Sequence, residues 1–414
     1  MPQMEQEIIL LYGTDFVWDC RNRVQMRLSA LRHAVGKTLF TLWDDSPARK
    51  TARGITFDPT QKCGRAWVNI FQPLPVYPRL PAARCRRILD HVMRLCSGRE
   101  EEYQWLLRWM AYPLQHVGAK MDTAIVVMGA EGTGKSLFWH RIYGALFGEY
   151  TKIIGQAELE SSFNGWMSQL ILAICEEVVS RDEQRHHKGK LKNMITSAML
   201  SINEKNLPMR QEPNHINFVF LSNESIPMIL DQGDRRYMVL HTNDVPDGEY
   251  FEQLWAEVQD GGLAAFCHYL LDLDLGDFNQ HTKPPRNEEK LRLIEAGLPN
   301  TLLFVKEWRD GVLDLPYISC KREDLFRAYC AWCVARKAFV RDEKIFFNDL
   351  ASHGAMTTRM STPAPRIDGP ARRPPARTPT TAMTPIAAAR MTLGCGPTRT
   401  TKYPRDTRAA TMRA

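Results

Sequence analysis

The stretch Gly129-Ala-Glu-Gly-Thr-Gly-Lys135-Ser136 decides the fold of this 414-residue chain. It follows an apolar run at 124–128 and precedes a stretch typical of a helix at 135–147. A strand, a glycine-rich turn and a helix form the context in which the pattern G-x-x-x-x-G-K-[ST] builds a P-loop. The sequence therefore predicts an α/β fold whose central turn binds phosphate groups.

The residue types of this turn suit a nucleoside triphosphate. Glycines let backbone N–H groups close around phosphate oxygens at a helix N-terminus, whose dipole favours anions. We expect Lys135 to reach the β and γ phosphates and the Ser136 hydroxyl to ligate Mg²⁺. ATP and Mg²⁺ are the predicted cofactors, and the predicted binding residues are Gly129, Ala130, Glu131, Gly132, Thr133, Gly134, Lys135, Ser136 and Leu137.

Two carboxylates follow the apolar run at 169–175. We expect this run to form a buried strand beside the P-loop strand, with Glu176 and Glu177 at its carboxyl end. Glu176 would complete the Mg²⁺ shell, and Glu177 would orient the attacking water. Hydrolases of the motor type need this second carboxylate, whereas small-molecule kinases generally do not. The alternative is an ordinary strand end with solvated acids.

A polar amide ends the next apolar run, Ile216-Asn-Phe-Val-Phe-Leu-Ser-Asn223. A strand that ends in an amide can place it against the γ-phosphate and the lytic water. In isolation Asn223 would be interpreted as a turn residue. After a P-loop and a strand with two carboxylates, we interpret it as a sensor of the nucleotide.

Two arginines, Arg235 and Arg236, stand directly before the apolar strand expected at 237–240. A guanidinium supplied by a neighbouring subunit can stabilise the charge that develops on a transferred phosphoryl group. Arg236 is the first choice for this arginine finger, and Arg235 is the alternative. The competing interpretation is a surface ion pair with Asp231 or Asp234.

A hairpin is predicted at 200–210, where a short strand, a polar tip and a return strand follow one another. Lys205 would lie at its tip, where it is free to contact a phosphate backbone. We expect Arg210 and Lys192 to support that contact.

The charge of the chain is unevenly distributed. Ten of its 54 basic residues but only two of its 47 acidic ones lie in 361–414, which leaves 44 bases and 45 acids in the first 360 residues. The body is therefore not broadly basic, and any binding of nucleic acid has to use local basic features. The stretch 356–414 is rich in Pro, Thr and Arg and shows no periodicity, so we expect disorder. A frameshift product is the favoured interpretation, and a basic nucleic-acid-binding tail is the alternative.

The composition bounds the protein class. A hydrophobic fraction of 44% supports ordinary buried cores, and no apolar run approaches the roughly 18 residues of a membrane span. The segment 7–12 is too short for a signal peptide and lacks a basic leader. Ten scattered cysteines predict reduced thiols in a cytoplasm. Cys330 and Cys333 are expected on a buried helix face, and His186 and His187 in a polar loop.

Strands and helices alternate between 120 and 243, which predicts a parallel sheet with helical crossovers. The expected strands are 124–128, 169–175, 216–221 and 237–240. Helices are expected at 84–109 and 249–272, and two more near Val305 and Tyr329. The expected divisions are an N-terminal helical and β appendage at 1–80, a helical collar at 81–119, an ATPase core at 120–245, a small helical or winged-helix unit at 246–355 and the tail at 356–414.

Taken in order, these motifs resemble the superfamily 3 helicases of viruses, phages and plasmids. They are most similar to the helicase half of phage and prophage primase–helicases, and the resemblance runs from about Arg53 to Leu350. Besides the P-loop, the matching residues are Phe57-Asp-Pro59, Asn69-Ile-Phe71, Trp109-Met-Ala-Tyr-Pro-Leu-Gln-His116, Lys120, Phe147-Gly-Glu-Tyr150, Phe163-Asn164, Cys175-Glu-Glu177, Ile195-Thr196, Lys205, Ser222-Asn223 and Asp234-Arg-Arg-Tyr237.

The resemblance implies a P-loop ATPase of the AAA+ type that assembles as a homo-hexamer, with nucleotide between subunits. It implies that the hairpin carrying Lys205 lines a pore and tracks single-stranded DNA. The expected activity is ATP-dependent DNA unwinding during phage, prophage or plasmid replication, in the cytoplasm of the bacterial host, and no membrane partner is expected.

Two features depart from the family pattern. About 80 residues precede the helicase-like part, too few for the primase domain that such proteins often carry, so we expect any primase or polymerase partner on a separate chain. Cys175-Glu176 replaces the Asp-Glu pair that is common in the family. A P-loop kinase or another non-helicase NTPase is the alternative function, and a non-catalytic DNA-binding prophage remnant is the third.

Overall fold

The computed structural model of the protein describes residues 2–176, 184–205 and 209–352, with the backbone alone for 184–188. The predictions for Glu177 and for the tail at 356–414 fall outside the described residues. No helix in the described part is long and apolar enough to cross a membrane.

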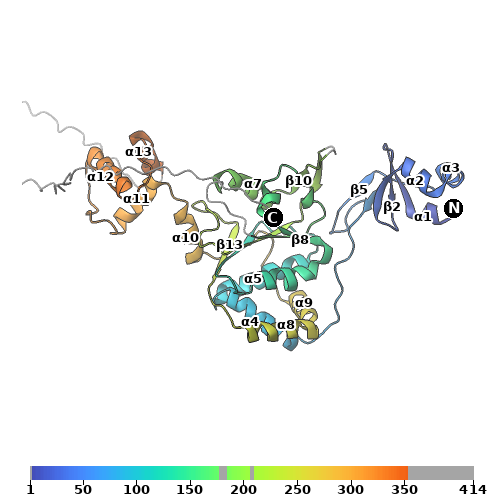
Figure 1. Cartoon of the computed structure of the whole chain (residues 1–414), viewed down its shortest axis with the longest axis horizontal. Helices are drawn as coiled ribbons and strands as arrows, with labels where there is room; N and C mark the ends of the chain where they lie inside the picture. The colour runs from blue at the N-terminus through green and yellow to red at the C-terminus, as the bar shows by residue number, and fades with distance from the viewer. Residues whose placement is uncertain (1, 177–183, 206–208, 353–414) are drawn as a thin grey trace, which may run out of the picture. The chain divides into compact units, whose positions relative to one another are not determined.

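The central element is a five-stranded parallel sheet with the order β13-β7-β12-β9-β8 (Figure 1). Its apolar strands are buried on both faces, as parallel strands between two layers usually are. The strands are β7 (Ala124–Gly129), β8 (Thr151–Ile154), β9 (Leu172–Glu176), β12 (Asn217–Ser222) and β13 (Tyr237–Thr242).

The strand order corrects one prediction. β9, which ends in Glu176, does not lie beside the P-loop strand β7, because β12 pairs with both of them. The strand that ends before Asn223 therefore lies between the strand that leads into the phosphate turn and the strand that ends in Glu176. The sequence did not predict β8, because this strand has only four residues and is partly exposed.

Side chains alternate between two cores on the two faces of the sheet. Ile125 and Val127 of β7 join the cluster built by α4 (Arg86–Leu95), α5 (Glu100–Gln115) and α9 (Leu263–Asp272). Val126 and Met128 join the cluster that contains α7 (Gln184–Thr196) and β10 (Met199–Ile202). Figure 1 shows these two sets of elements on opposite sides of the sheet.

Two predicted helices are interrupted. The helix expected at 84–109 is a 3-10 turn at Ala82–Cys85 followed by α4 and α5, with Ser97 and Gly98 at positive φ between the two α-helices. The helix expected at 249–272 consists of α8 (Gly248–Glu257) and α9, joined by a π-helical segment at Val258–Gly262 where Gly261 has φ 88°. Apolar spacing continues through both breaks, which is why periodicity alone did not reveal them.

The segment after the P-loop is also irregular. It runs as a π-helix at Leu137–Tyr143 and a 3-10 segment at Gly144–Tyr150, which kinks at Gly148 before β8. The short α6 (Gln156–Glu160) and the 3-10 turn Gly165–Met167 then lead to β9.

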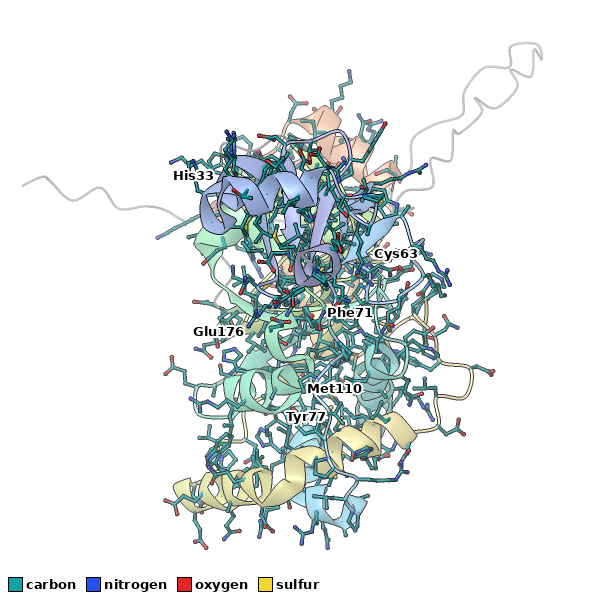
Figure 2. The ribbon with its side chains drawn as sticks, turned by 90° about the vertical axis from the view of Figure 1, so that its right-hand side faces the viewer. His33, Cys63, Phe71, Tyr77, Met110 and Glu176 are labelled. Atoms are coloured by element: carbon teal, nitrogen blue, oxygen red, sulfur yellow. The ribbon has the colours of Figure 1, made fainter. Side chains whose placement is uncertain are left out.

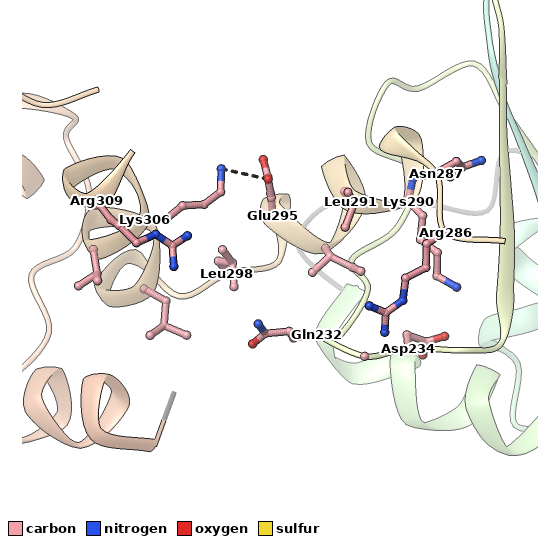
Figure 3. A pocket seen from close by; sticks show the side chains of 14 residues that line it. Gln232, Asp234, Arg286, Asn287, Lys290, Leu291, Glu295, Leu298, Lys306 and Arg309 are labelled. Carbon is pink, nitrogen blue, oxygen red and sulfur yellow. Dashed lines mark hydrogen bonds and ion pairs between the residues drawn. The ribbon is translucent and has the colours of Figure 1, made fainter. Parts of the chain in front are cut away.

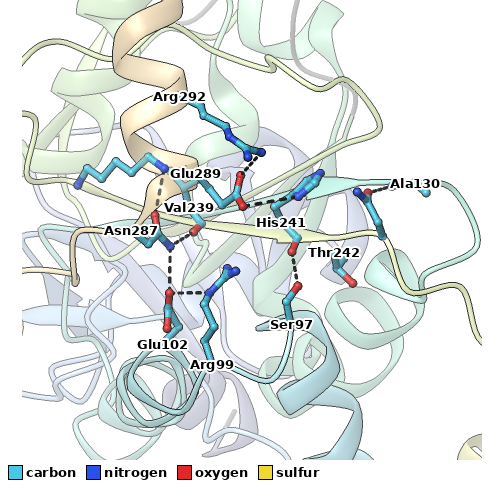
Figure 4. Close-up of polar contacts among 12 residues, drawn as sticks. Ser97, Arg99, Glu102, Ala130, Val239, His241, Thr242, Asn287, Glu289 and Arg292 are labelled. Atoms are coloured by element: carbon cyan, nitrogen blue, oxygen red, sulfur yellow. Dashed lines mark hydrogen bonds and ion pairs between the residues drawn. The ribbon is translucent and has the colours of Figure 1, made fainter. Parts of the chain in front are cut away.

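Side chains close the free edge of β13. The carbonyls of Tyr237, Val239 and His241 each accept a hydrogen bond from a side chain, in turn from Lys290 Nζ (2.8 Å), Asn287 Nδ2 (2.7 Å) and Ser97 Oγ (2.5 Å). Alternate carbonyls of an edge strand point away from the sheet, so these three donors satisfy one whole row of acceptors. Figure 4 shows the Asn287 and Ser97 contacts and the ion pairs around them.

The N-terminal part has its own sheet and core. α1 (Pro2–Glu7) precedes β1 (Ile8–Leu11), β2 (Phe16–Asp19), β3 (Val24–Arg27) and β4 (Lys50–Ala52), in the order β3-β2-β1-β4. α2 (Leu28–Val35) and α3 (Lys37–Asp44) bury Leu31 and Trp43 against it. A parallel pair, β5 (Gly54–Thr56) and β6 (Trp67–Asn69), follows.

The C-terminal described part consists of α10 (Glu288–Ala296), α11 (Asn300–Arg309), α12 (Arg322–Ala335) and α13 (Glu343–Ser352). Phe304, Tyr329 and Phe346 form the centre of its core. The described residues between 243 and 352 contain no strand, so this part fits the helical alternative and not the winged helix.

Candidate functional site

The P-loop leaves the carboxyl end of β7 in a conformation that requires glycine at two positions. At Gly129, φ is 137°, and a Cβ would lie 1.8 Å from the backbone oxygen of Thr242 in β13. At Gly134, φ is 85°, and a Cβ would lie 2.5 Å from Cε1 of His91. The loop is therefore packed against two other elements and cannot accept side chains there.

Lys135 lies inside the loop. Its Nζ donates hydrogen bonds to the carbonyls of Gly129 (2.9 Å) and Ala130 (2.7 Å) and to Oγ1 of Thr133 (3.2 Å). The residue is 6% exposed, and burial lowers the pKa of its ammonium. In this motif backbone N–H groups cradle the phosphates and the lysine reaches the β and γ phosphates, so Lys135 would exchange these carbonyl contacts for phosphate oxygens.

The side chain of His91 in α4 packs against the P-loop at Gly134. Its Nε2 lies 3.4 Å from the carbonyl oxygen of Gly134, and its Nδ1 lies 3.0 Å from the hydroxyl of Tyr250. The side chain is fully buried, and this burial lowers its pKa to about 4. At neutral pH the ring is therefore uncharged, so it can support the loop without repelling Lys135. No sequence pattern singled out His91, because a histidine on an apolar helix face has no local signature.

Ser136 and Glu176 meet at the position where the sequence predicts a metal. Ser136 Oγ donates a hydrogen bond of 2.6 Å to Glu176 Oε1. The Nε2 of His140 lies 3.3 Å from the same carboxylate oxygen. His140 follows Ser136 by four residues, so both side chains face β9 from one side of the helical segment. His140 was not among the predicted site residues, although its spacing from Ser136 was visible in the sequence.

This oxygen pair fits Mg²⁺. Among the described residues, no group of three or more His, Cys, Asp and Glu side chains is arranged to hold a metal. Mg²⁺ usually takes only one or two protein oxygens and completes its shell with phosphates and water. Ser136 and Glu176 would therefore hold the ion only together with a nucleotide. Glu177, which directly follows Glu176, lies outside the described residues.

Asn223 reaches the P-loop from β12. Its Nδ2 lies 3.4 Å from Oε1 of Glu131, the third residue of the loop. Because β12 lies directly beside β7, its carboxyl end brings this amide next to the phosphate turn. The structure thus places Asn223, Lys135, Ser136 and Glu176 at one edge of the sheet.

Arg235 and Arg236 lie at the opposite edge. The carbonyl oxygen of Arg236 accepts a 2.8 Å hydrogen bond from the N–H of Ala124, the first residue of β7. The guanidinium of Arg236 lies 3.0 Å from the buried carboxylate of Asp234, so the first choice for the arginine finger is held within its own chain. Arg235 is exposed, and the described residues give its guanidinium no partner.

A cavity of about 310 Å³ adjoins this arginine pair and is lined in part by Asp234 and Arg286 (Figure 3). No P-loop residue lines it. Lys306 on its wall lies 3.0 Å from Glu295, and Lys290 donates to the backbone of β13. These contacts hold α10 and α11 beside the loop that carries Asp234.

The predicted hairpin is present. β10 pairs antiparallel with β11 (Arg210–Pro213), with Ile202 opposite Arg210, and Lys205 is exposed in the turn between them. Asn164 holds the turn: its Oδ1 accepts from the N–H of Asn203 (2.6 Å), and its Nδ2 donates to the carbonyl of Ser201 (2.8 Å). The sequence reasoning did not assign this supporting role to Asn164.

The two other predicted DNA contacts have carboxylate partners. The guanidinium of Arg210 lies 3.0 Å from Glu204 and 2.6 Å from Glu212. Lys192 lies on α7 and not on the hairpin, and its Nζ pairs with Asp231. Among the residues that the structure describes, Lys205 is therefore the predicted DNA contact that is exposed without such a pair.

Two minor predictions also have outcomes. Cys330 and Cys333 lie on α12, and Cys333 is buried in the core of that part, as expected. His186 and His187 were expected in a loop, but they lie within α7.

The chain is similar to known proteins in sequence and in fold. A family of unknown function, DUF5906, matches residues 127–236. The DNA primase-polymerase of Nitratiruptor phage NrS-1 is 28% identical over 242 residues, which are 56% of this chain and 33% of that protein. The chain thus spans about one third of this curated relative.

The solved structures show the same relation at the level of the fold. The apo structure of the NrS-1 C-terminal region matches with a TM-score of 0.60 and 20% identity, covering 83% of this chain and 82% of that one. An A-form apo structure of the same region matches with a TM-score of 0.60 and 21% identity, covering 78% and 82%. The chain is thus similar in sequence to a phage DNA primase-polymerase, and it shares its fold with the C-terminal region of NrS-1.

Proposed function

We propose that this chain is a superfamily 3 helicase that uses ATP to translocate on single-stranded DNA and to unwind duplex in phage or prophage replication. One observation carries the proposal. Lys135, Ser136, Glu176 and Asn223 converge at the carboxyl edge of the parallel sheet, and the Lys205 hairpin leads into β12 at the amino edge of the same sheet. A rigid strand thus connects the nucleotide site to the element that would contact DNA.

Each residue at the carboxyl edge has a role in hydrolysis. Lys135 neutralises the β and γ phosphates, and Glu177, the residue after β9, orients the attacking water. Asn223 senses the γ-phosphate through the turn that it already contacts at Glu131. Ser136 and Glu176 would hold Mg²⁺, which would supply positive charge against the phosphates. His140 packs beside Glu176, with its Nε2 3.3 Å from the carboxylate oxygen that Ser136 contacts; burial lowers its pKa, and this nitrogen makes no hydrogen bond to the described residues.

The positions of the two edges support the proposal that the chain assembles into a ring. β7 has six residues, so its two ends lie roughly 17 Å apart at about 3.3 Å per residue. No arginine side chain spans that distance, so Arg235 and Arg236 cannot reach the P-loop of their own chain. They would serve the nucleotide of a neighbouring copy, as in a homo-hexamer of AAA+ subunits. The exposed Arg235 suits that role better than Arg236, which is paired with Asp234.

The order β13-β7-β12-β9-β8, with a sensor strand between the P-loop strand and the acidic strand, supports the AAA+ assignment. Similarity to a phage primase-polymerase supports a role in phage DNA replication, in the bacterial cytoplasm and together with a primase or polymerase.

A DNA-stimulated ATPase assay tests the proposal. ATP hydrolysis is expected to rise on addition of oligothymidine, and gel filtration with ATP and DNA is expected to show a hexamer. Glu177→Gln is expected to abolish hydrolysis and to preserve ATP binding, which equilibrium binding of a fluorescent ATP analogue measures.

A strand-displacement assay tests the hairpin. Lys205→Ala is expected to keep basal ATPase activity and to lose unwinding; Lys152→Ala, which removes a cation outside the hairpin, is the matched control. Unwinding at the wild-type rate by Lys205→Ala would contradict the hairpin assignment. A phosphorylated small-molecule product would favour a kinase, and the absence of both hydrolysis and ATP binding would favour a non-catalytic protein.

A further inference from the structure

The segment 46–89 carries a strong excess of positive charge. It contains nine basic residues and a single acidic one, Asp58. The first 360 residues as a whole are nearly neutral, with 44 bases and 45 acids, so this segment is a local basic feature. Its centre is the β5–β6 pair and the loop between the two strands, which we call the β5–β6 loop (residues 57–66).

The one acid is already used by the loop itself. The Asp58 carboxylate accepts hydrogen bonds from the N–H groups of Thr60 (2.9 Å), Lys62 (2.8 Å) and Cys63 (2.7 Å) and from the Thr60 hydroxyl (2.6 Å). Asp58 therefore organises the loop, and its charge is directed at backbone donors. Figure 2 labels Cys63, the last of these backbone donors.

Three cations, one directly before β5 and two in the β5–β6 loop, have no partner among the described residues. Arg53, Lys62 and Arg65 are exposed, and the described residues offer none of their side chains an ion pair or a hydrogen bond. Arg79 pairs with Asp272, and Arg84 lies 3.4 Å from Asp260. Arg86 and Arg87, at the start of α4, are also exposed, and their side chains have no ion pair or hydrogen bond among the described residues. Three of the five such cations of the segment thus lie around β5 and β6.

An exposed aromatic ring lies in the same place. Trp67, the first residue of β6, is 44% exposed. Its register partner is Gly54, where a Cβ would lie 3.0 Å from Cζ3 of the indole, so the ring rests on β5 because glycine leaves room. Stacking on an exposed aromatic ring together with cations along a backbone is how proteins bind single strands without reading sequence.

This surface is fixed to the sheet at the edge from which the hairpin emerges. Phe57 contacts the ring of His215 with 6.1 Å between centroids, and His215 Nδ1 lies 2.7 Å from the carbonyl of Gly118, ahead of β7. His215 also lies between Pro213, where the hairpin ends, and Asn217, where β12 begins. The β5–β6 surface and the hairpin therefore share one support.

We propose that Arg53, Lys62, Arg65 and Trp67 form a second binding site for single-stranded DNA, in which the cations contact phosphates and a base stacks on Trp67. The assignment of single-stranded DNA as the ligand of this site rests on the proposed function. It would hold the strand beside the Lys205 hairpin, so that each advance of the hairpin starts from an anchored strand.

Photocrosslinking of the full-length protein tests the site without any variant. An oligothymidine that contains 5-iododeoxyuridine is irradiated with the protein in the absence of nucleotide, and the cross-linked peptides are mapped by mass spectrometry. A crosslink at Trp67 is expected, and its absence when other residues do crosslink would overturn the proposal. Because no ATP is present, the result is independent of whether the chain hydrolyses ATP.

Fluorescence anisotropy with labelled oligothymidine measures the contributions. The logarithm of the binding constant falls linearly with the logarithm of the salt concentration, with a slope of about −0.7 per phosphate contact on a single strand. The triple variant Arg53→Ala/Lys62→Ala/Arg65→Ala is expected to make this slope shallower by about 2. Trp67→Ala is expected to weaken binding by about 5- to 100-fold, and Trp67→Phe to retain most of it. Basal ATPase activity without DNA is expected to stay unchanged in all of these variants.

The control removes three exposed cations of the preceding strands and helices, as Arg21→Ala/Arg32→Ala/Lys37→Ala. An equal loss of slope in this control would show that only bulk charge matters and would overturn the site. Equal affinity for a blunt duplex, or equally strong competition by polyglutamate at the same charge concentration, would also contradict a single-strand site.

Discussion

The separation of the arginine pair from the P-loop predicts how far ATP hydrolysis falls when Arg235 is replaced. Arg235 lies at the amino edge of the sheet and Lys135 at the carboxyl edge, about 17 Å apart along β7. If Arg235 acts on the nucleotide of a neighbour, Arg235→Ala removes a transition-state contact. Such contacts are worth roughly 10³- to 10⁵-fold in kcat. The variant is expected to lose hydrolysis while it binds ATP as the wild type does.

Mixing two inactive variants then tests the direction of the contact. A site in a mixed ring is intact only when its P-loop comes from an Arg235→Ala chain and its finger comes from a Lys135→Ala chain. With equal amounts and free exchange, each condition holds for half of the sites, so about one quarter of the sites are intact. Steady-state ATPase activity of the mixture is expected to reach about a quarter of the wild-type value, whereas each variant alone stays inactive.

Arg236→Ala is the matched control. It removes the partner of the buried Asp234 carboxylate and is expected to cost about 3 kcal/mol of folding stability, seen as a lower Tm of its own chain. That loss should not be repaired by mixing. A mixture of Arg235→Ala and Lys135→Ala that remains inactive after subunit exchange would refute the trans role, as would full activity of Arg235→Ala alone.

Three further predictions concern the supports of the site. The pKa of His91 is lowered from 6.5 to about 4, so below pH 6.5 the unfolded chain binds more protons than the folded chain, and stability decreases as the pH decreases. Urea unfolding at pH 7 and at pH 5 should show that His91→Gln loses about 2 kcal/mol less stability over this range than the wild type. Gly134→Ala is expected to weaken binding of a fluorescent ATP analogue more than tenfold, because the added Cβ meets His91. The control is Gly36→Ala, at φ 83° with open space around it, which adds only backbone strain of about 1–2 kcal/mol. Asn164→Ala removes two hydrogen bonds to the hairpin, about 1 kcal/mol each, and should reduce DNA-stimulated but not basal ATPase activity; equal reduction of both would contradict its supporting role.

The strands around the P-loop were predictable because buried parallel strands are continuous apolar runs. Three of the expected runs, at 124–128, 216–221 and 237–240, coincide with β7, β12 and β13 to within two residues at each end. Their order was not predictable, since apolar runs do not encode which neighbours they pair with. Placing β9 next to β7 was therefore an assumption about topology, and it was wrong.

The candidate site shows the same division. Lys135, Ser136 and Asn223 could be predicted as site residues, because the P-loop motif and the strand pattern are both visible in consecutive sequence. His91 contacts that site only through tertiary packing, so nothing around it in the chain marks it, whereas His140 was marked only by its spacing of four residues from Ser136. The preference for Arg236 over Arg235 rested on its position next to the strand, whereas the burial of Asp234 decides which guanidinium is engaged.

The row of side-chain donors along β13 limits how copies of this protein can meet. Since Lys290, Asn287 and Ser97 occupy the outward carbonyls, a strand from another chain finds no free acceptors there and cannot lengthen the sheet. Contacts between copies on that side must therefore be made by side chains, which can slide and re-pair without unravelling backbone hydrogen bonds. In the proposed ring, such contacts would let neighbouring subunits shift repeatedly while each sheet stays intact.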